Sequence, residues 1–219
     1  MSSSANVPFR KHEVEDYERR RYRGLDQKIV HGREMRILRR FFRRIGPGPE
    51  RILDVPCGYG RFSGLCLGQG LALSGADLSF HMVRRALDAS PEPARHSGAV
   101  ADLKTGLPFK DGAFEVIFSM RFFHHVHDPD DRRRILAEFG RVSGRWAIVS
   151  FYRMNGLHGL QRLIRRRLFG KKTKINMVSW SEFKRDLEAA GFAVRKKKAL
   201  IAGIHAQHIL LLEKVRNGS

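Results

Sequence analysis

Three aspartates, Asp54, Asp77 and Asp102, stand at the predicted ends of three successive strands. Asp54 is followed by Gly58 and Gly60 in a turn that leads into a helix, and glycines there let the backbone approach a ligand closely. A carboxylate at the end of the next strand can accept hydrogen bonds from ribose hydroxyls. Because the carboxyl ends of neighbouring parallel strands lie at one edge of a sheet, the three acids predict a site for an adenosine-containing ligand.

Histidines follow the fourth predicted strand, at positions 124, 125 and 127. An imidazole at this edge could remove a proton from a hydroxyl or a protonated amine, and the alternative is a histidine that only packs and shapes the pocket. Cys57 lies inside the glycine turn, where it should face the bound ligand rather than act as a nucleophile. Cys57 and Cys66 are nine positions apart and predict neither a disulfide framework nor a metal site.

Strands alternate with helices through the middle of the chain, which predicts an α/β fold with a mostly parallel sheet covered on both faces. The last two strands can form a closing antiparallel pair. The expected strands are 51–55, 72–77, a segment ending near 101–102, 114–120, 146–152, 194–202 and 206–215. The expected helices are 26–45, 61–70, 82–89, 132–142 (with its start at 128–131) and 181–191.

Four ordered segments carry a family resemblance. The run Ile52–Phe62 resembles the first motif of class I S-adenosylmethionine-dependent methyltransferases, and Gly75–Met82 resembles the second. Ala101–Leu103 with Leu107–Phe109 is similar to the third, and Phe114–Val126 is similar to the fourth strand and its loop. The resemblance covers about residues 50–152. It implies a Rossmann-like seven-stranded sheet, S-adenosylmethionine as cofactor, and the branch that methylates small molecules and lipids.

Carried over by position, the resemblance implies roles for individual residues. The glycines of the turn would line the methionine part of the cofactor, Asp77 would bind the ribose, and Asp102 would contact adenine. His125 is the candidate general base, and no metal is implied. Pro56 stands where the family usually has a small residue, but both glycines are intact. The implied cofactor-binding residues are Asp54, Cys57, Gly58, Gly60, Asp77, Leu78, Met82, Asp102, Leu103, Met120 and Arg121.

The formal net charge of +20 lies in the flanks of the 219-residue chain. Residues 1–51 carry +7 and residues 153–219 carry +12, whereas residues 52–152 carry only +1. A neutral centre with basic flanks predicts an anionic partner, and the alternative is a charged surface that only keeps the protein in solution.

We divide the chain into a basic N-terminal tail or lid, residues 1–25, and a methyltransferase domain, residues 26–219. A basic amphipathic insert at about 154–178 interrupts the domain, and its segment 157–174 could cover the active site or contact an anionic membrane. With no apolar run of membrane-spanning length and no secretory signal in the sequence, we expect a cytoplasmic protein, with peripheral contact at the inner face of a membrane as one option.

Three classes of function stay open at this point. We expect methylation of a small-molecule or lipid-like, anionic acceptor. Methylation of tRNA or rRNA is the second class, supported by the basic flanks, although the sequence shows no recognisable RNA-binding module. The third is a cofactor-binding scaffold without activity, because methyl transfer does not require a dedicated catalytic residue. A nicotinamide-dependent dehydrogenase is disfavoured, since Ser63 stands where its third glycine would be.

Overall fold

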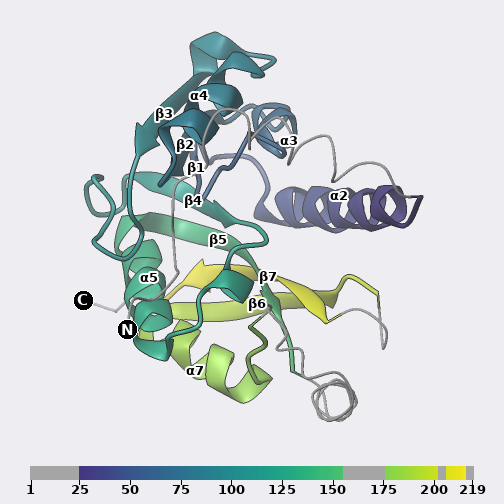
Figure 1. The fold of residues 1–219 in the computed structure, drawn as a ribbon, viewed down its shortest axis with the longest axis vertical. Helices are drawn as coiled ribbons and strands as arrows, with labels where there is room; N and C mark the ends of the chain where they lie inside the picture. Colours follow the sequence, from purple (N-terminus) through teal and green to yellow (C-terminus); the bar gives the residue numbers. More distant parts are fainter. Residues whose placement is uncertain (1–24, 155–175, 202–205, 216–219) are drawn as a thin grey trace.

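A seven-stranded sheet forms the centre of the protein in a computed structural model that describes residues 25–154, 176–201 and 206–215 (Figure 1). The strand order is β3-β2-β1-β4-β5-β7-β6, and neighbouring strands are parallel except where β7 is involved. The predicted mostly parallel sheet with an antiparallel closing strand is therefore confirmed. The strands are β1 (Arg51–Asp54), β2 (Ala72–Asp77), β3 (His96–Val100), β4 (Phe114–Ser119), β5 (Ser143–Tyr152), β6 (Phe192–Ala199) and β7 (Gln207–Lys214).

Helices cover both faces of this sheet. Successive strand residues point to opposite faces, so that Ile148 belongs to the apolar cluster under α2 and α3, and Ala147 and Val149 belong to the cluster under α5 and α7. Helix α4 contacts β2 and β3. The helices are α2 (Leu25–Ile45), α3 (Ser63–Leu67), α4 (Phe80–Asp88), α5 (Pro129–Val142) and α7 (Trp180–Ala189), with single turns η1 (Pro93–Arg95) and η2 (Phe123–His125).

Side-chain caps fix where the helices begin. The Ser79 hydroxyl accepts a hydrogen bond from the Met82 backbone, and α4 therefore begins two residues before the predicted start at Met82. The Asp128 carboxylate caps α5 through the Asp130 N–H, as its position before Pro129 predicts. These caps place the strand-to-helix turns at the carboxyl edge of the sheet.

Two elements near the candidate site differ from the prediction. The helix expected over 61–70 is the shorter α3, because Phe62 is its N-cap and Arg61 belongs to the preceding turn. Strand β3 ends at Val100, so Asp102 lies in the following loop rather than at the strand end.

Some predicted features lie outside the described residues. These are almost all of the N-terminal tail or lid and the amphipathic segment 157–174. Among the helices that the structure does describe, none has an apolar stretch that could cross a bilayer.

Candidate cofactor site

A pocket opens where β1, β2 and β4 end. Its walls come from the turn after β1, from the end of β2 and the start of α4, and from the loop after β4. Since these segments are distant in sequence, the pocket is a product of the parallel strand order 2-1-4. It is lined by Asp54, Pro56, Cys57, Gly58, Tyr59, Arg61, Phe62, Asp77, Met82, Met120, Arg121, Phe122 and His125.

The two glycines of the turn after β1 have different roles. Gly58 has a φ of +53°, and a Cβ placed on it would meet no atom within 4 Å, so its backbone faces open space in the pocket. Gly60 has a φ of +82°, and a Cβ there would lie 3.0 Å from the Ala86 Cα of α4. Gly58 thus exposes backbone to a ligand, whereas Gly60 lets α4 pack closely against the turn.

Asp77 ties the glycine turn to the end of β2. One carboxylate oxygen accepts a hydrogen bond from the Gly58 N–H at 3.0 Å, and the other accepts one from the Ser79 N–H at 3.0 Å. Burial raises the pKa of the Asp77 carboxyl, and these backbone donors act in the opposite direction. The Leu78 backbone is a third donor, and because a carboxylate has about four acceptor positions, Asp77 retains capacity for a further donor such as a ribose hydroxyl.

A second carboxyl, that of Asp54, is buried near the half-buried Asp77. Its exposed fraction is 2%, and burial, followed by the negative charge of Asp77, raises its pKa well above the usual value. Burial likewise raises the pKa of the Cys57 thiol, which keeps the thiol protonated and argues against a nucleophilic role. The pocket therefore combines two carboxyl groups in surroundings that favour a positively charged ligand.

A buried glutamate that the sequence analysis missed supports the other wall. Glu34 of α2 has an exposed fraction of 0%, and its carboxylate accepts hydrogen bonds from Arg121 Nε at 2.7 Å and Arg61 Nη2 at 2.9 Å. Gln207 of β7 donates to the same carboxylate at 3.0 Å. Because Arg61 and Arg121 both line the pocket, Glu34 fixes two side chains of the cofactor site from behind.

The loop after β4 brings His125 to the pocket. Its second residue is Arg121, whose φ of +56° is unusual for a residue with a side chain and whose N–H donates to Ser150 Oγ at 2.7 Å. His125 is exposed and lines the pocket, and its ring centroid lies 3.9 Å from that of the buried His124. His127 is also exposed but does not line the pocket.

The structure gathers most, but not all, of the residues predicted for the site. Four of them do not line the pocket: Gly60, Leu78, Asp102 and Leu103. Asp102 accepts a hydrogen bond from the Lys104 N–H at 2.9 Å, and Leu103 is buried in the main apolar cluster. The residues gathered are Asp54, Cys57, Gly58, Asp77, Met82, Met120, Arg121 and His125.

Comparisons with known proteins agree with this geometry. Residues 53–145 match the model of a methyltransferase domain family. The chain is 26% identical over 145 residues to 27-O-demethylrifamycin SV methyltransferase of Amycolatopsis mediterranei, a match covering 65% of the chain and 53% of that relative. The chain thus spans about half the length of this curated relative.

Solved structures share the fold over nearly the whole chain. Magnesium protoporphyrin IX methyltransferase from Synechocystis, with bound S-adenosylhomocysteine, superposes with a TM-score of 0.74 at 17% identity, covering 93% of this chain and 95% of that one. A TehB-like S-adenosylmethionine-dependent methyltransferase from Corynebacterium glutamicum gives a TM-score of 0.63 at 18% identity, with 94% and 100% covered. The chain therefore has the fold of class I S-adenosylmethionine-dependent methyltransferases, and its residues 53–145 match a methyltransferase domain family.

The residues of the pocket fit S-adenosylmethionine, the cofactor that the resemblance implies. S-adenosylmethionine carries a sulfonium and an ammonium group, and the paired carboxyls of Asp54 and Asp77 complement positive charge. The open space in front of Gly58 leaves its backbone accessible, and Asp77 has free acceptor capacity. Within the described ranges, no group of three or more His, Cys, Asp or Glu side chains could hold a metal ion.

Proposed function

We propose that this methyltransferase transfers a methyl group from S-adenosylmethionine to a small-molecule acceptor that is lipid-like and anionic. The observation that carries the proposal is the pocket that Asp54, Asp77 and His125 line together. The carboxyls are suited to a cationic cofactor, and His125 presents an imidazole to whatever enters from solvent.

Each of the pocket residues has a distinct part in this proposal. Gly58 and Asp77 bind the cofactor, which when bound supplies an electrophilic methyl group on sulfur. Arg121, held by Glu34, shapes the wall beside that group. Much of the rate of such an in-line transfer comes from alignment of the two reactants, which this rigid wall provides.

His125 is proposed as the general base for a hydroxyl or ammonium acceptor. Its imidazole is exposed, so it can take a proton from the acceptor and return it to solvent. Its ring packs against the buried His124, whose ring centroid lies 4.8 Å from that of Tyr152. This packing gives the His125 imidazole a defined position.

The charge distribution and the relatives support the acceptor class. The basic flanks favour an anionic molecule. The relatives in Amycolatopsis and Synechocystis are named for acting on a rifamycin and on a porphyrin, both of which are small molecules. Contact of segment 157–174 with an anionic membrane, and a location at the inner face of that membrane, remain parts of this proposal.

The described cations give less support to RNA as the acceptor. In the basic run of β6, Arg195 is paired with Glu213, at 2.8 Å, and Lys197 lies 3.7 Å from the ring centroid of Trp180. Two of the four consecutive cations at 195–198 are therefore engaged within the protein.

A turnover assay tests the proposal. The purified chain is incubated with S-adenosylmethionine and, separately, with phenols, carboxylates, anionic amphiphiles and bulk tRNA, while released S-adenosylhomocysteine is measured. We expect transfer to a member of the small-molecule set, and about a hundredfold lower kcat in His125→Ala with unchanged cofactor affinity. The matched control, His127→Ala, should retain full turnover.

Other results of the same assay would contradict the proposal. Transfer to tRNA alone would make the chain an RNA methyltransferase. Cofactor binding by calorimetry with no transfer to any acceptor would favour the scaffold. Equal turnover in His125→Ala and the wild type would leave His125 a residue that only shapes the pocket.

A further inference from the structure

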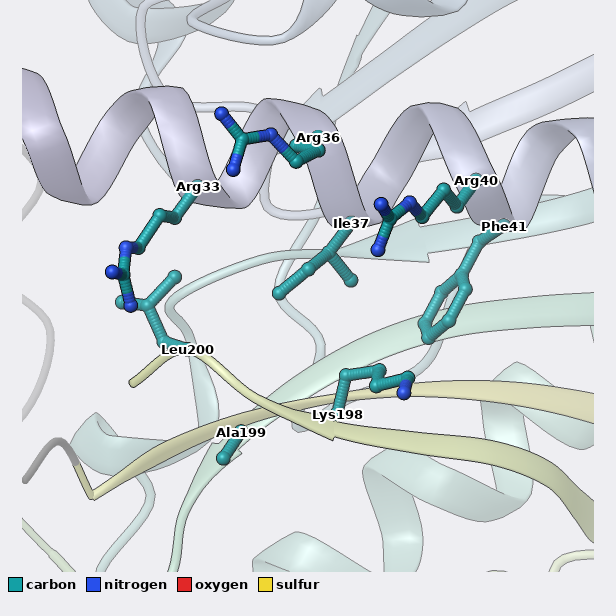
Figure 2. A pocket seen from close by; sticks show the side chains of 8 residues that line it. All are labelled: Arg33, Arg36, Ile37, Arg40, Phe41, Lys198, Ala199 and Leu200. Atoms are coloured by element: carbon teal, nitrogen blue, oxygen red, sulfur yellow. The ribbon is translucent and has the colours of Figure 1, made fainter. Parts of the chain in front are cut away.

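A second concave site lies between α2 and the end of β6. It has a volume of about 350 Å³, and none of its lining residues lines the cofactor pocket. Figure 2 shows Arg33 and Arg40 reaching from α2 toward the strand, with Ile37 between them. We call this site the α2–β6 groove.

The rim of the groove is positively charged. Arg33 and Arg40 are seven positions apart on α2, about 10 Å along the helix axis, and Lys198 of β6 faces them across the groove. All three side chains are exposed, and no carboxylate of the described residues forms an ion pair with any of them. These cations repel one another, so an anion between them relieves the repulsion and gains charge-assisted hydrogen bonds.

The floor of the groove is apolar. It consists of Ile37, which is half-buried, and of Phe41 and Leu200, each with an exposed fraction of 3%. An inorganic anion would leave this floor uncovered. A ligand with both an anionic head and an apolar chain would match both parts of the groove.

The shape of the groove selects among anionic ligands. Its volume lies within the range of small-molecule sites, about 300–1,000 Å³. The aromatic ring in the floor, Phe41, is almost fully buried and offers no face for a nucleic-acid base to stack on. Guanidinium groups bind phosphate oxygens through two parallel N–H donors, which favours a phosphate over a single carboxylate as the head group.

The groove lies at the same sheet edge as the cofactor pocket. β6 and β5 are both antiparallel to β7, so β6 ends at the edge where β4 ends. Arg33 also directly precedes Glu34, whose carboxylate holds Arg121 in the cofactor pocket. Helix α2 thus lines the groove directly, and it supports the cofactor pocket through Glu34 without lining it.

We propose that the α2–β6 groove binds a single-chain phosphate amphiphile. Its phosphate lies between Arg33, Arg40 and Lys198. Its apolar chain lies on Ile37, over the edges of Phe41 and Leu200 that remain exposed. Binding at this groove does not require the cofactor, so this proposal is independent of the proposed methyl transfer.

Calorimetry with monododecyl phosphate, below its micelle concentration, tests the proposal on the full chain. We expect saturable binding of one molecule, weakened about tenfold or more in the double variant Arg33→Gln/Arg40→Gln. The matched control is Arg39→Gln/Arg43→Gln, which removes the same charge from exposed positions of α2 outside the groove and should change affinity by at most about twofold. Lys198→Gln, on a different element, should also weaken binding.

Two ligand controls, with tRNA as a competing ligand, complete the test. Dodecyl maltoside has the same chain without charge, and inorganic phosphate has the head without the chain, so both should bind much more weakly than dodecyl phosphate. Equal binding of dodecyl maltoside, equal losses in the two double variants, or no saturable binding would overturn the proposal. So would a loss of tRNA affinity specific to the groove variants without any dodecyl phosphate binding, which would assign the groove to RNA.

The affinity for S-adenosylhomocysteine serves as the check on folding. It should be unchanged in every variant, because no groove residue lines the cofactor pocket. If Arg33→Gln/Arg40→Gln lowers the affinity for S-adenosylhomocysteine, the proposal is tested by dodecyl phosphate binding to Lys198→Gln alone.

Discussion

Two groups of buried acids flank the cofactor pocket, and their surroundings are opposite. Glu34 is surrounded by donors: two guanidinium groups and the Gln207 amide share its two oxygens. Asp54 and Asp77 lie near each other instead, and burial raises the pKa of both. The charge of Glu34 is thus neutralised within the fold, whereas neither aspartate forms an ion pair with a described residue and Asp77 is supported there by backbone N–H donors alone.

This difference separates a structural carboxylate from a functional one. A buried charge that already has its partners contributes to the folded structure and is costly to disturb. A carboxylate whose pKa is raised by burial lowers the stability of the fold while it is ionised. Such groups gather at binding and catalytic sites. Variants at the two places should therefore have opposite effects on folding and binding.

The largest effect on stability is expected at Glu34. Glu34→Ala leaves Arg61 and Arg121 buried without their carboxylate, and it should lower the free energy of unfolding by about 3–5 kcal/mol in urea denaturation. Glu34→Gln keeps the shape and part of the hydrogen bonding and should cost less. A loss below about 1 kcal/mol for Glu34→Ala would mean that the network is not structural.

The next effect is on binding, at Asp77. Asp77→Ala removes the proposed ribose acceptor and should weaken S-adenosylhomocysteine binding about tenfold or more in calorimetry. Asp88→Ala, which removes an exposed carboxylate paired with Arg84, is the control and should leave that affinity unchanged. Unchanged affinity in Asp77→Ala would show that the ribose assignment is wrong.

The smallest effect is a gain in stability at Asp54. Asp54→Asn removes a buried charge near Asp77 and should raise the free energy of unfolding by about 1 kcal/mol at pH 8, while weakening cofactor binding. The pKa of Asp54 is higher in the folded than in the unfolded chain, so the folded wild type takes up a proton first as the pH falls. Its destabilisation therefore disappears toward acid pH, and the advantage of Asp54→Asn should shrink with it.

Denaturation of Asp54→Asn and the wild type across a pH series measures this trend. A variant that is less stable than the wild type at pH 8 would mean that the Asp54 carboxylate has a stabilising partner. The contrast with Glu34 would then be lost.

Local patterns were sufficient to predict most of the fold. The strand Phe114–Ser119 and the cap at Asp128 are visible in the sequence because apolar runs and capping residues act on neighbouring positions. The pairing of Asp54 with Asp77 was also within reach, because parallel strands align their carboxyl ends. The predicted length of α3 was wrong, since Phe62 serves as its N-cap and the helix begins only at Ser63.

Glu34 could not be assigned from the sequence because its partners are far away. Arg61 lies 27 positions from it and Arg121 lies 87 positions from it. The one available signal was its place on the apolar stripe of α2, four residues after Val30 and four before Leu38. An acid in such a stripe indicates a buried partner, but only the tertiary structure shows which one.

The basic run of β6 has a consequence for aggregation. β6 is an outer strand of the sheet, and Arg195, Lys196 and Lys198 are exposed along it. Cations on an edge strand discourage another chain from adding a strand there. The opposite edge, β3, carries small residues and exposes 52% of Val100. Intermolecular β-pairing is therefore blocked at β6 and directed to β3, where a single lysine in place of Val100 would protect the second edge as well.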